Sequence, residues 1–454
     1  MSSVFAIAHI ALRAAFRSRL VVTMIIVLAV VNIVLPLTVK DNGTIASKVQ
    51  VLVSYTLVFS QGILAIATLW SACAAVSTEI QDQNIHLVVS KPVARLQVWL
   101  GKWLGLLMMN ALLLLITGLT VYGLLRFQTR SSVISEEDQI ELQEQILISR
   151  QQVRPVLPDV DTTAREQLRR IQARGQLGAG DPGTKLEELR QRMLFLAFSA
   201  PMDKPVSWEF QLPNTPSTDH PVFLNYKFNA GFATGEFIRG TWSFGTRERP
   251  DDISVEVEHV AGANTVKVPV DAIQAGKPLI VTYANHEESP YSLQFDPKTG
   301  LSLLYHRGSF EGNLLRTLLV MFFQLGFYAA IGLTAGTLFS MPVAAFTSMF
   351  VILMQFFGRF IGEMSKEKII FGKEEGMGPA MEILNAVVLK IYQFADLLLK
   401  PLQAFNPFEY LSTGVQIGWS TVAIEFLIKV VLYGGVTGVL GILLFNRREI
   451  GIPQ

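Results

Sequence analysis

Long apolar stretches alternate with short polar segments along this 454-residue chain, and the pattern predicts six membrane-spanning helices. A helix needs about 20 predominantly apolar residues to cross a bilayer, and most of these stretches carry no charge. The predicted spans are Leu20–Thr38, Val51–Val76, Trp103–Leu125, Thr317–Phe339, Val343–Phe357 and Thr421–Phe445. We therefore expect an α-helical integral membrane protein with six transmembrane helices.

The residues before the first span follow a different pattern. Between Val4 and Phe16, apolar residues recur at helical spacing, while Arg13 and Arg17 lie four apart on another face. This predicts that residues 1–19 form an amphipathic helix on the cytoplasmic surface. The alternative is that this helix only extends the first span into the lipid headgroups.

Basic residues gather on one side of the predicted spans. They are Arg13, Arg17, Arg19, Lys91, Arg95, Lys102, Arg447 and Arg448. Because cytoplasmic segments of membrane proteins are rich in Lys and Arg, we expect both termini and the turn between spans two and three in the cytoplasm. Residues 20–126 then hold spans one to three, and residues 314–454 hold spans four to six.

Residues 127–313 contain no apolar stretch of membrane length, and the alternation of spans places them outside the cytoplasm. Residues 135–200 are highly charged with a narrow apolar stripe, which predicts helices that pack on each other or on a second subunit. Over residues 205–308, apolar and polar positions alternate in about eight short runs bounded by turn residues, which predicts a β-sandwich or jelly roll.

The C-terminal half adds two expectations. The fourth span contains glycines that would allow close contact between helices. They are Gly326, Gly332 and Gly336. Residues 358–420 are expected to form an outer or re-entrant segment, because Lys390 and Asp396 argue against a crossing by residues 381–399. If residues 381–399 do cross, the C-terminus lies outside.

Composition supports membrane residence and gives no support for nucleic-acid binding. Half of the residues are apolar, 17% are charged and the net charge is +1. Mean hydropathy is +0.38. A chain without a strong positive charge lacks the electrostatic footprint of a nucleic-acid-binding protein. The single cysteine, Cys73, has no intrachain partner for a disulfide and is expected to be a small buried apolar residue.

The sequence shows no catalytic, cofactor or metal site, so we do not expect an enzyme. Gly178–Lys185 approaches a phosphate-binding loop, but the order Gly-Thr-Lys and a proline among the residues that would bind phosphate argue against one. Glu425 and Lys429 form a candidate intramembrane pair, although pairing four residues apart and snorkelling account for them without a substrate. The histidines show no metal-ligand spacing. They are His9, His86, His220, His259, His286 and His306.

The polar segment between spans two and three carries a resemblance to a known family. An acidic residue after span two, a Leu-Val-Val-Ser-Lys-Pro-Val-x-Arg segment and a Gly-Lys pair at span three resemble the membrane subunit of type 2 ABC transporters. The residues concerned are Glu79, Ile85, His86, Leu87, Val88, Ser90, Lys91, Pro92, Arg95 and Lys102. The C-terminal Phe445–Glu449 and the Asn406–Phe408 segment are also similar to that family. The resemblance covers the six-span frame and not the large insert.

The resemblance implies a permease subunit in a bacterial cytoplasmic (inner) membrane. It implies a dimer with a second permease copy, surrounded by membrane lipid. It also implies a separate ABC ATPase subunit that binds the ATP, so that this chain holds no cofactor. Ser77–Arg95 would be the coupling helix, with Ile85, Leu87 and Val88 on its apolar face. Glu79 and Lys102 are expected to pair and brace the helical hairpin.

Two classes of function remain open at this point. The first is transport of a substrate across or out of the membrane, with the insert contacting cargo or an extracytoplasmic partner. The second is a membrane-anchored binding or scaffold protein without transport activity. The substrate, the direction of transport and the choice between homodimer and heterodimer are not defined by the sequence.

Overall fold

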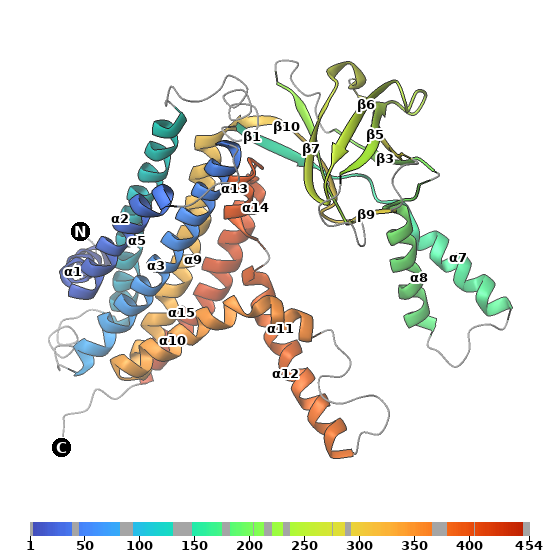
Figure 1. The fold of residues 1–454 in the computed structure, drawn as a ribbon. Helices are drawn as coiled ribbons and strands as arrows, with labels where there is room; N and C mark the ends of the chain where they lie inside the picture. Colours follow the sequence, from blue (N-terminus) through green and yellow to red (C-terminus); the bar gives the residue numbers. More distant parts are fainter. Residues whose placement is uncertain are drawn as a thin grey trace. The chain divides into compact units, whose positions relative to one another are not determined.

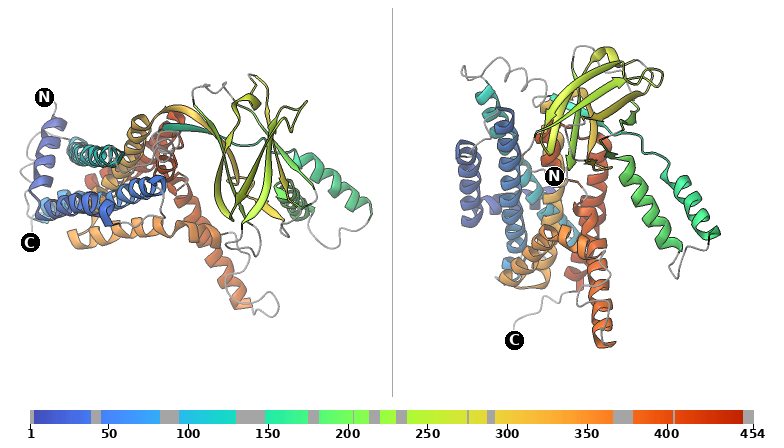
Figure 2. Two further views of the ribbon diagram at one scale, coloured as in Figure 1. Left: turned by 45° about the horizontal axis from the view of Figure 1, so that its top comes forward. Right: turned by 45° about the vertical axis from the view of Figure 1, so that its right-hand side comes forward.

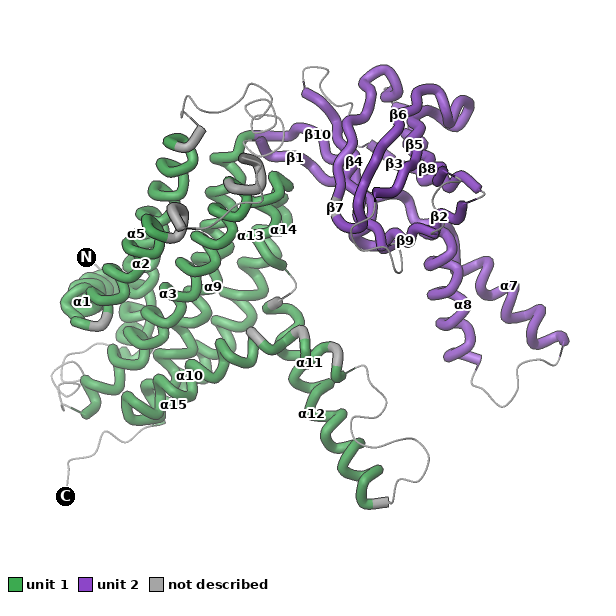
Figure 3. Tube along the Cα trace, viewed as in Figure 1, with its two compact units in different colours: residues 1–146, 309–454 green, residues 147–308 purple. Residues whose placement is uncertain are grey.

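The computed structural model describes most of the chain and divides it into two compact units, shown in Figure 3. Unit 1 comprises Met1–Ile146 and Ser309–Gln454, and unit 2 comprises Leu147–Gly308. The described residues are 3–38, 45–81, 94–129, 148–174, 182–202, 204–212, 220–229, 237–274, 276–286, 292–365, 379–403 and 405–447. Unit 2 lies within residues 127–313, the region that contains no apolar stretch of membrane length.

Unit 1 is built from helices (Figure 1). Those before the insert are α1 (Ser3–Arg17), α2 (Arg19–Thr38), α3 (Ile45–Gln81) and α5 (Arg95–Thr129). Those after it are α9 (Phe310–Leu338), α10 (Met341–Phe356), α11 (Gly358–Met364), α12 (Pro379–Gln403), α13 (Pro407–Ser412), α14 (Trp419–Phe426), the π-helix η3 (Leu427–Gly434) and α15 (Gly435–Arg447). The helices α14, η3 and α15 follow one another without a break.

Four helical stretches in the described part of the chain are long and apolar enough to cross a membrane. They are Val49–Gln81, Arg95–Phe127, Phe310–Leu338 and Trp419–Arg447. Helices α1 and α2 meet at a bend of 68° and would add a fifth if counted together. Helix α10 has 16 residues and is therefore about 24 Å long, which is less than the ~30 Å of a bilayer core. Four of the six predicted spans thus have full-length counterparts.

Helix α9 is central to unit 1 and packs against α3, α5, α10, η3 and α15 (Figures 1 and 2). The approach to α3 is close, because a Cβ added at Gly332 would lie 2.6 Å from the Cβ of Ala72. A Cβ added at Gly336 would lie 2.7 Å from the carbonyl oxygen of Cys73. The predicted role of these two glycines as helix contacts is confirmed, since no larger residue fits without displacing α3.

Unit 2 contains the strands that the alternating pattern predicts. They are β1 (Ile148–Val153), β2 (Ser199–Ala200), β3 (Val206–Phe210), β4 (Val222–Asn229), β5 (Ile238–Gly245), β6 (Ile253–His259), β7 (Gly262–Val268), β8 (Leu279–Asn285), β9 (Leu293–Phe295) and β10 (Leu301–Ser309), with a 3-10 turn at Val270–Ala272. One sheet has the order β1-β10-β4-β9-β2, with β7 also paired to β4, and the other has the order β3-β8-β5-β6. The β-rich character of residues 205–308 is confirmed.

The two sheets share one aromatic core. Trp242 and Tyr283 of the second sheet are fully buried, as are Phe228 and Phe295 of the first. The ring centroids of Trp242 and Tyr226 lie 4.9 Å apart, and those of Tyr283 and Phe295 lie 5.8 Å apart. Large aromatic rings from opposing sheets therefore close the core, and each buries much apolar surface.

The prediction that residues 135–200 form only helices is wrong at both ends of the described part. Ile148–Val153 forms β1, which pairs with β10, and Ser199–Ala200 forms β2, which pairs with β9. The local composition of β1 favours a helix, but its partner strand lies some 150 residues later, where local patterns give no signal of it. Residues 130–147 lie outside the described part.

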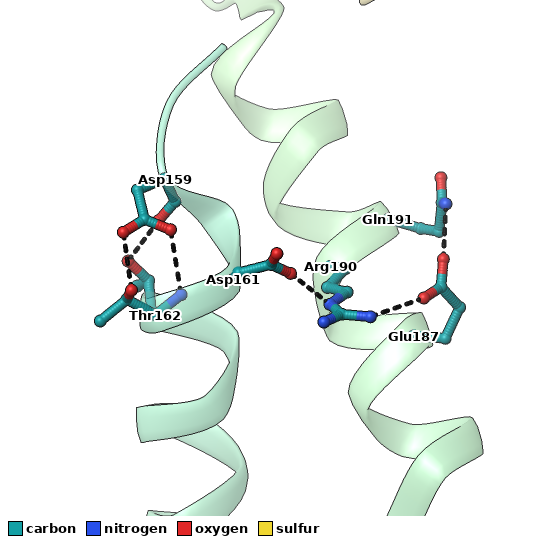
Figure 4. Close-up of polar contacts among 7 residues, drawn as sticks. Asp159, Asp161, Thr162, Glu187, Arg190 and Gln191 are labelled. Carbon is teal, nitrogen blue, oxygen red and sulfur yellow. Dashed lines mark hydrogen bonds and ion pairs between the residues drawn. The ribbon is translucent and has the colours of Figure 1, made fainter.

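Helices α7 (Val160–Ala173) and α8 (Pro182–Ala197) are confirmed as helices and pack on each other. Asp159 caps α7 by accepting a hydrogen bond from the backbone N–H of Thr162. Figure 4 shows Arg190 of α8 between Asp161 of α7 and Glu187 of its own helix. The Arg190 Nε to Asp161 Oδ1 distance is 2.5 Å. This bridge joins the two helices at their exposed side.

Candidate functional site

The segment that carries the family resemblance lies between α3 and α5. Residues 82–93 are outside the described part of the chain, and seven of the candidate residues fall among them. They are Ile85, His86, Leu87, Val88, Ser90, Lys91 and Pro92. The remaining candidates, Glu79, Arg95 and Lys102, lie on the two helix ends that flank this segment.

Glu79 and Lys102 join the end of α3 to the first turns of α5. The Lys102 Nζ to Glu79 Oε2 distance is 2.5 Å. Lys102 also donates a hydrogen bond to the carbonyl oxygen of Ala75. The Lys102 side chain is 7% exposed and that of Glu79 is 36% exposed. A buried ammonium group is costly without a partner, so the ion pair fixes the spacing of the two helix ends.

Arg95, the first residue of α5, reaches the C-terminal end of α15. Its Nη1 donates to the backbone carbonyls of Phe445 and Asn446, the latter at 3.0 Å. The guanidinium carbon also lies 5.6 Å from the centroid of the Phe445 ring. The last carbonyls of a helix lack partners within the helix and carry the negative end of its dipole. The Arg95 guanidinium donates hydrogen bonds to these carbonyls and places a positive charge at the negative end of the dipole.

Two tryptophans extend this contact along α5. Trp99 is buried, and a Cβ added at Gly438 of α15 would lie 2.9 Å from its ring. The rings of Trp99 and Trp103 stack with centroids 6.4 Å apart. Trp103 Nε1 donates to the carbonyl of Gly326 on α9 at 2.9 Å. The first turns of α5 are thus tied to α15 and α9 as well as to α3.

Helix α1 covers another side of the same region. A Cβ added at Gly105 would lie 2.6 Å from the carbonyl oxygen of Ala8, and one added at Gly101 would lie 2.7 Å from Ile7. Ser3 Oγ donates to the side-chain oxygen of Gln97 at 3.1 Å. The N-terminal amphipathic helix therefore packs along the beginning of α5.

The candidate pair of Glu425 and Lys429 is formed, and both side chains are buried among the helices of unit 1. Lys429 Nζ lies 2.9 Å from Glu425 Oε2, and both side chains are 4% exposed. Lys429 lies in the π-helix η3, an element that the sequence does not indicate. Helix α9 packs against η3. Buried ion pairs and π-helices are both frequent at functional sites.

A second polar group lies between α9 and α10. Gln324 Nε2 donates to the Tyr328 hydroxyl at 2.8 Å and to Gln355 Oε1 at 3.1 Å. The Tyr328 hydroxyl donates to the same Gln355 oxygen at 2.5 Å. Sequence analysis missed this cluster, because isolated Gln and Tyr residues in apolar stretches do not reveal that they converge.

The histidines are less scattered in space than along the chain. His220 and His306 of unit 2 have ring centroids 4.0 Å apart, although 86 positions separate them. Burial and the charge of His220 lower the pKa of His306. Within the described residues, no group of three or more His, Cys, Asp or Glu side chains is arranged to hold a metal ion. Lys185, at the end of the phosphate-loop-like segment, pairs with Glu188.

Comparison of the chain with protein-family models and with curated proteins finds no match. The functional assignment therefore depends on the arrangement of the residues themselves. That arrangement joins both flanks of segment 82–93 to the surrounding helices.

Proposed function

We propose that the chain is the membrane-spanning subunit of an ABC transporter and that residues 77–95 dock on a separate ATPase subunit. Residues 82–93, between α3 and α5, are called the coupling segment below. The observation that carries the proposal is the bracing of both helix ends that flank segment 82–93. Glu79 and Lys102 lock α3 to α5, and Arg95 joins α5 to α15. A force applied to the segment would move several apolar helices together. A free polar turn between two spans needs no such bracing.

The proposal has a defined arrangement. Six spans are formed by α2, α3, α5, α9, α10 and the continuous helix from α14 to α15, with both termini in the cytoplasm of a bacterial inner membrane. Unit 2 then lies outside the cytoplasm, where it would meet cargo or an extracytoplasmic partner. ATP is bound by the ATPase subunit, and a second permease copy completes the dimer. Four long apolar helices support membrane insertion.

The first test changes the apolar face of the coupling segment. Replacing Leu87 and Val88 together with Asp would place two carboxylates where an apolar groove is expected. Desolvating carboxylates without partners costs several kcal/mol, which is enough to abolish a moderate interface, whereas the same change in a free turn would be nearly neutral. The measurement is copurification of an ATPase subunit with the tagged chain from its native host. Normal copurification and activity would contradict the proposal.

The second test separates docking from coupling. Glu79→Gln removes the charge that balances Lys102 but changes no residue of the coupling segment, 82–93. We expect lower ATP hydrolysis by the complex with nearly unchanged copurification. The matched control is Glu311→Gln, which breaks an exposed ion pair with Arg126 at the other end of α5. An equal loss of hydrolysis in both variants would show a general effect of ion-pair loss instead.

The alternative, a membrane-anchored scaffold that only presents unit 2, makes the opposite prediction. No P-loop ATPase would copurify, and neither variant would change any hydrolytic activity. A gene for an ATPase with a signature motif beside the gene for this chain would favour transport.

A further inference from the structure

The resemblance places Arg95 among residues that face the ATPase, but its side chain is engaged within unit 1. The Nη1 group bonds the carbonyls of Phe445 and Asn446, in the last three residues of α15. The aromatic ring of Phe445 lies beneath the guanidinium at 5.6 Å. Phe445 is itself buried. Arg95 therefore joins the C-terminal end of α15 to the first residue of α5, two positions after residue 93.

The contact continues deeper along the same pair of helices. Trp99, one turn after Arg95, fills the space left by two glycines of α15. A Cβ at Gly438 would lie 2.9 Å from the ring, and a Cβ at Gly441 would lie 3.1 Å from its Nε1. Thr334 of α9 donates to the carbonyl of Thr437 at 2.9 Å. The end of α15 is thus fixed to two neighbouring helices over about two turns.

We propose that Arg95 is a positioning residue that transmits movement of the coupling segment into the last helix, α15. This inference rests on the proposed function. Arg95 is two positions after residue 93, so a displacement of the segment reaches its backbone almost directly. A guanidinium bonded to helix-end carbonyls is a charge-assisted contact, which is stronger than a neutral hydrogen bond. The movement then passes to three helices, α3, α5 and α15, and not only to the two that flank the segment.

The same geometry at the opposite end of the last helix provides a matched control. Arg316 of α9 donates from Nη1 to the carbonyl of Ile417 at 3.0 Å, and its guanidinium lies 5.0 Å from the centroid of Trp419. Both arginines therefore contact backbone carbonyls and an aromatic ring, with two carbonyls for Arg95 and one for Arg316. Only Arg95 lies beside the coupling segment.

The experiment compares Arg95→Gln, Arg95→Lys and Arg316→Gln in the full chain purified with its ATPase from the native host. Three quantities are measured: the amount of ATPase recovered, its ATP hydrolysis and the melting temperature of the complex. For Arg95→Gln we expect recovery within about twofold and hydrolysis reduced about tenfold, since one charged hydrogen-bonded contact accounts for such a factor. Arg95→Lys keeps the positive charge and a hydrogen-bond donor, so we expect more hydrolysis than in Arg95→Gln but less than in the unchanged chain. Arg316→Gln should lower the melting temperature as much as Arg95→Gln, with normal hydrolysis.

The outcomes separate the two proposals. ATPase recovery with normal hydrolysis in Arg95→Gln overturns the role of Arg95 and leaves the proposed function standing. Equal loss of hydrolysis in Arg95→Gln and Arg316→Gln also overturns it, because the effect is then only structural. Loss of ATPase recovery in Arg95→Gln alone places Arg95 at the docking surface and overturns the inference. Absence of any ATPase with the unchanged chain refutes the proposed function and the inference together.

Discussion

His259 gives unit 2 an acid sensitivity whose sign and size follow from its surroundings. The residue is 2% exposed at the end of β6. The Tyr226 hydroxyl lies 3.1 Å from its Nδ1, and the Tyr283 hydroxyl lies 3.1 Å from its Nε2. The neutral ring can donate to one phenol and accept from the other. A protonated ring would be a charge in an aromatic core.

Burial lowers the pKa of His259 from 6.5 to about 4. The unfolded chain therefore binds a proton at a higher pH than the folded one. The stabilisation from the neutral ring is complete above about pH 6.5, declines as the pH falls from 6.5 towards 4, and changes no further below that value. A difference of about 2.5 pH units corresponds to about 3 kcal/mol of unfolding free energy.

The perturbation is His259→Gln, because the amide keeps a donor and an acceptor for the two phenols but does not titrate. Unit 2, residues 147–308, is expressed alone and unfolded in urea between pH 7.5 and pH 4. We expect a β-rich circular dichroism spectrum and a cooperative transition at neutral pH, since one core joins both sheets. The variant should be less stable than the unchanged unit at pH 7.5. Between pH 7.5 and pH 4, its free energy of unfolding should fall by about 3 kcal/mol less than that of the unchanged unit.

A matched control is His286→Gln, which changes a histidine that bonds the Thr241 hydroxyl at 2.8 Å. Measured in parallel, it separates the effect of the buried His259 from the effect of removing any histidine of unit 2. Side-chain hydrogen bonds from Thr162 and Gln191 lower the pKa values of Asp159 and Glu187, so these two carboxylates also lose stabilisation in acid. Only the difference between variants is therefore informative. Parallel curves for His259→Gln and the unchanged unit from pH 6.5 to pH 4 would refute the reasoning.

Three further predictions concern packing and surface charge. Gly105→Val should destabilise unit 1 by about 1–3 kcal/mol in a detergent melt, because its Cβ would lie 2.6 Å from the α1 backbone. Gly123→Ala should leave the stability unchanged or raise it, because a Cβ there has open space around it. Phe295→Ala should cost unit 2 about 3–5 kcal/mol in urea unfolding, and the same change at Phe237, which is 73% exposed, should cost little. Asp161→Asn should change stability by less than about 1 kcal/mol, because its bridge to α8 is at the surface; a larger loss would mean that the helix pair depends on it.

The sequence alone determined the parts of this protein that depend on local periodicity. Uncharged stretches of membrane length predicted α3, α5 and α9 because a single helix must satisfy its own backbone in an apolar environment. Alternation with a period of two predicted β4, β5 and β8 because neighbouring side chains of a strand point to opposite faces. The brace between Glu79 and Lys102 was also accessible, since the ends of a helical hairpin must meet.

Tertiary structure decided everything that depends on partners far along the chain. The residues of β1 form a strand because β10 offers them a sheet edge, although their composition favours a helix. Arg95 bonds carbonyls 350 positions later, and no local pattern distinguishes an arginine that faces a partner protein from one that closes a helix end. His220 and His306 come together for the same reason. The burial of Lys429 in a π-helix also required the packing of α9, because only neighbouring helices determine which side of an apolar stretch excludes water and lipid.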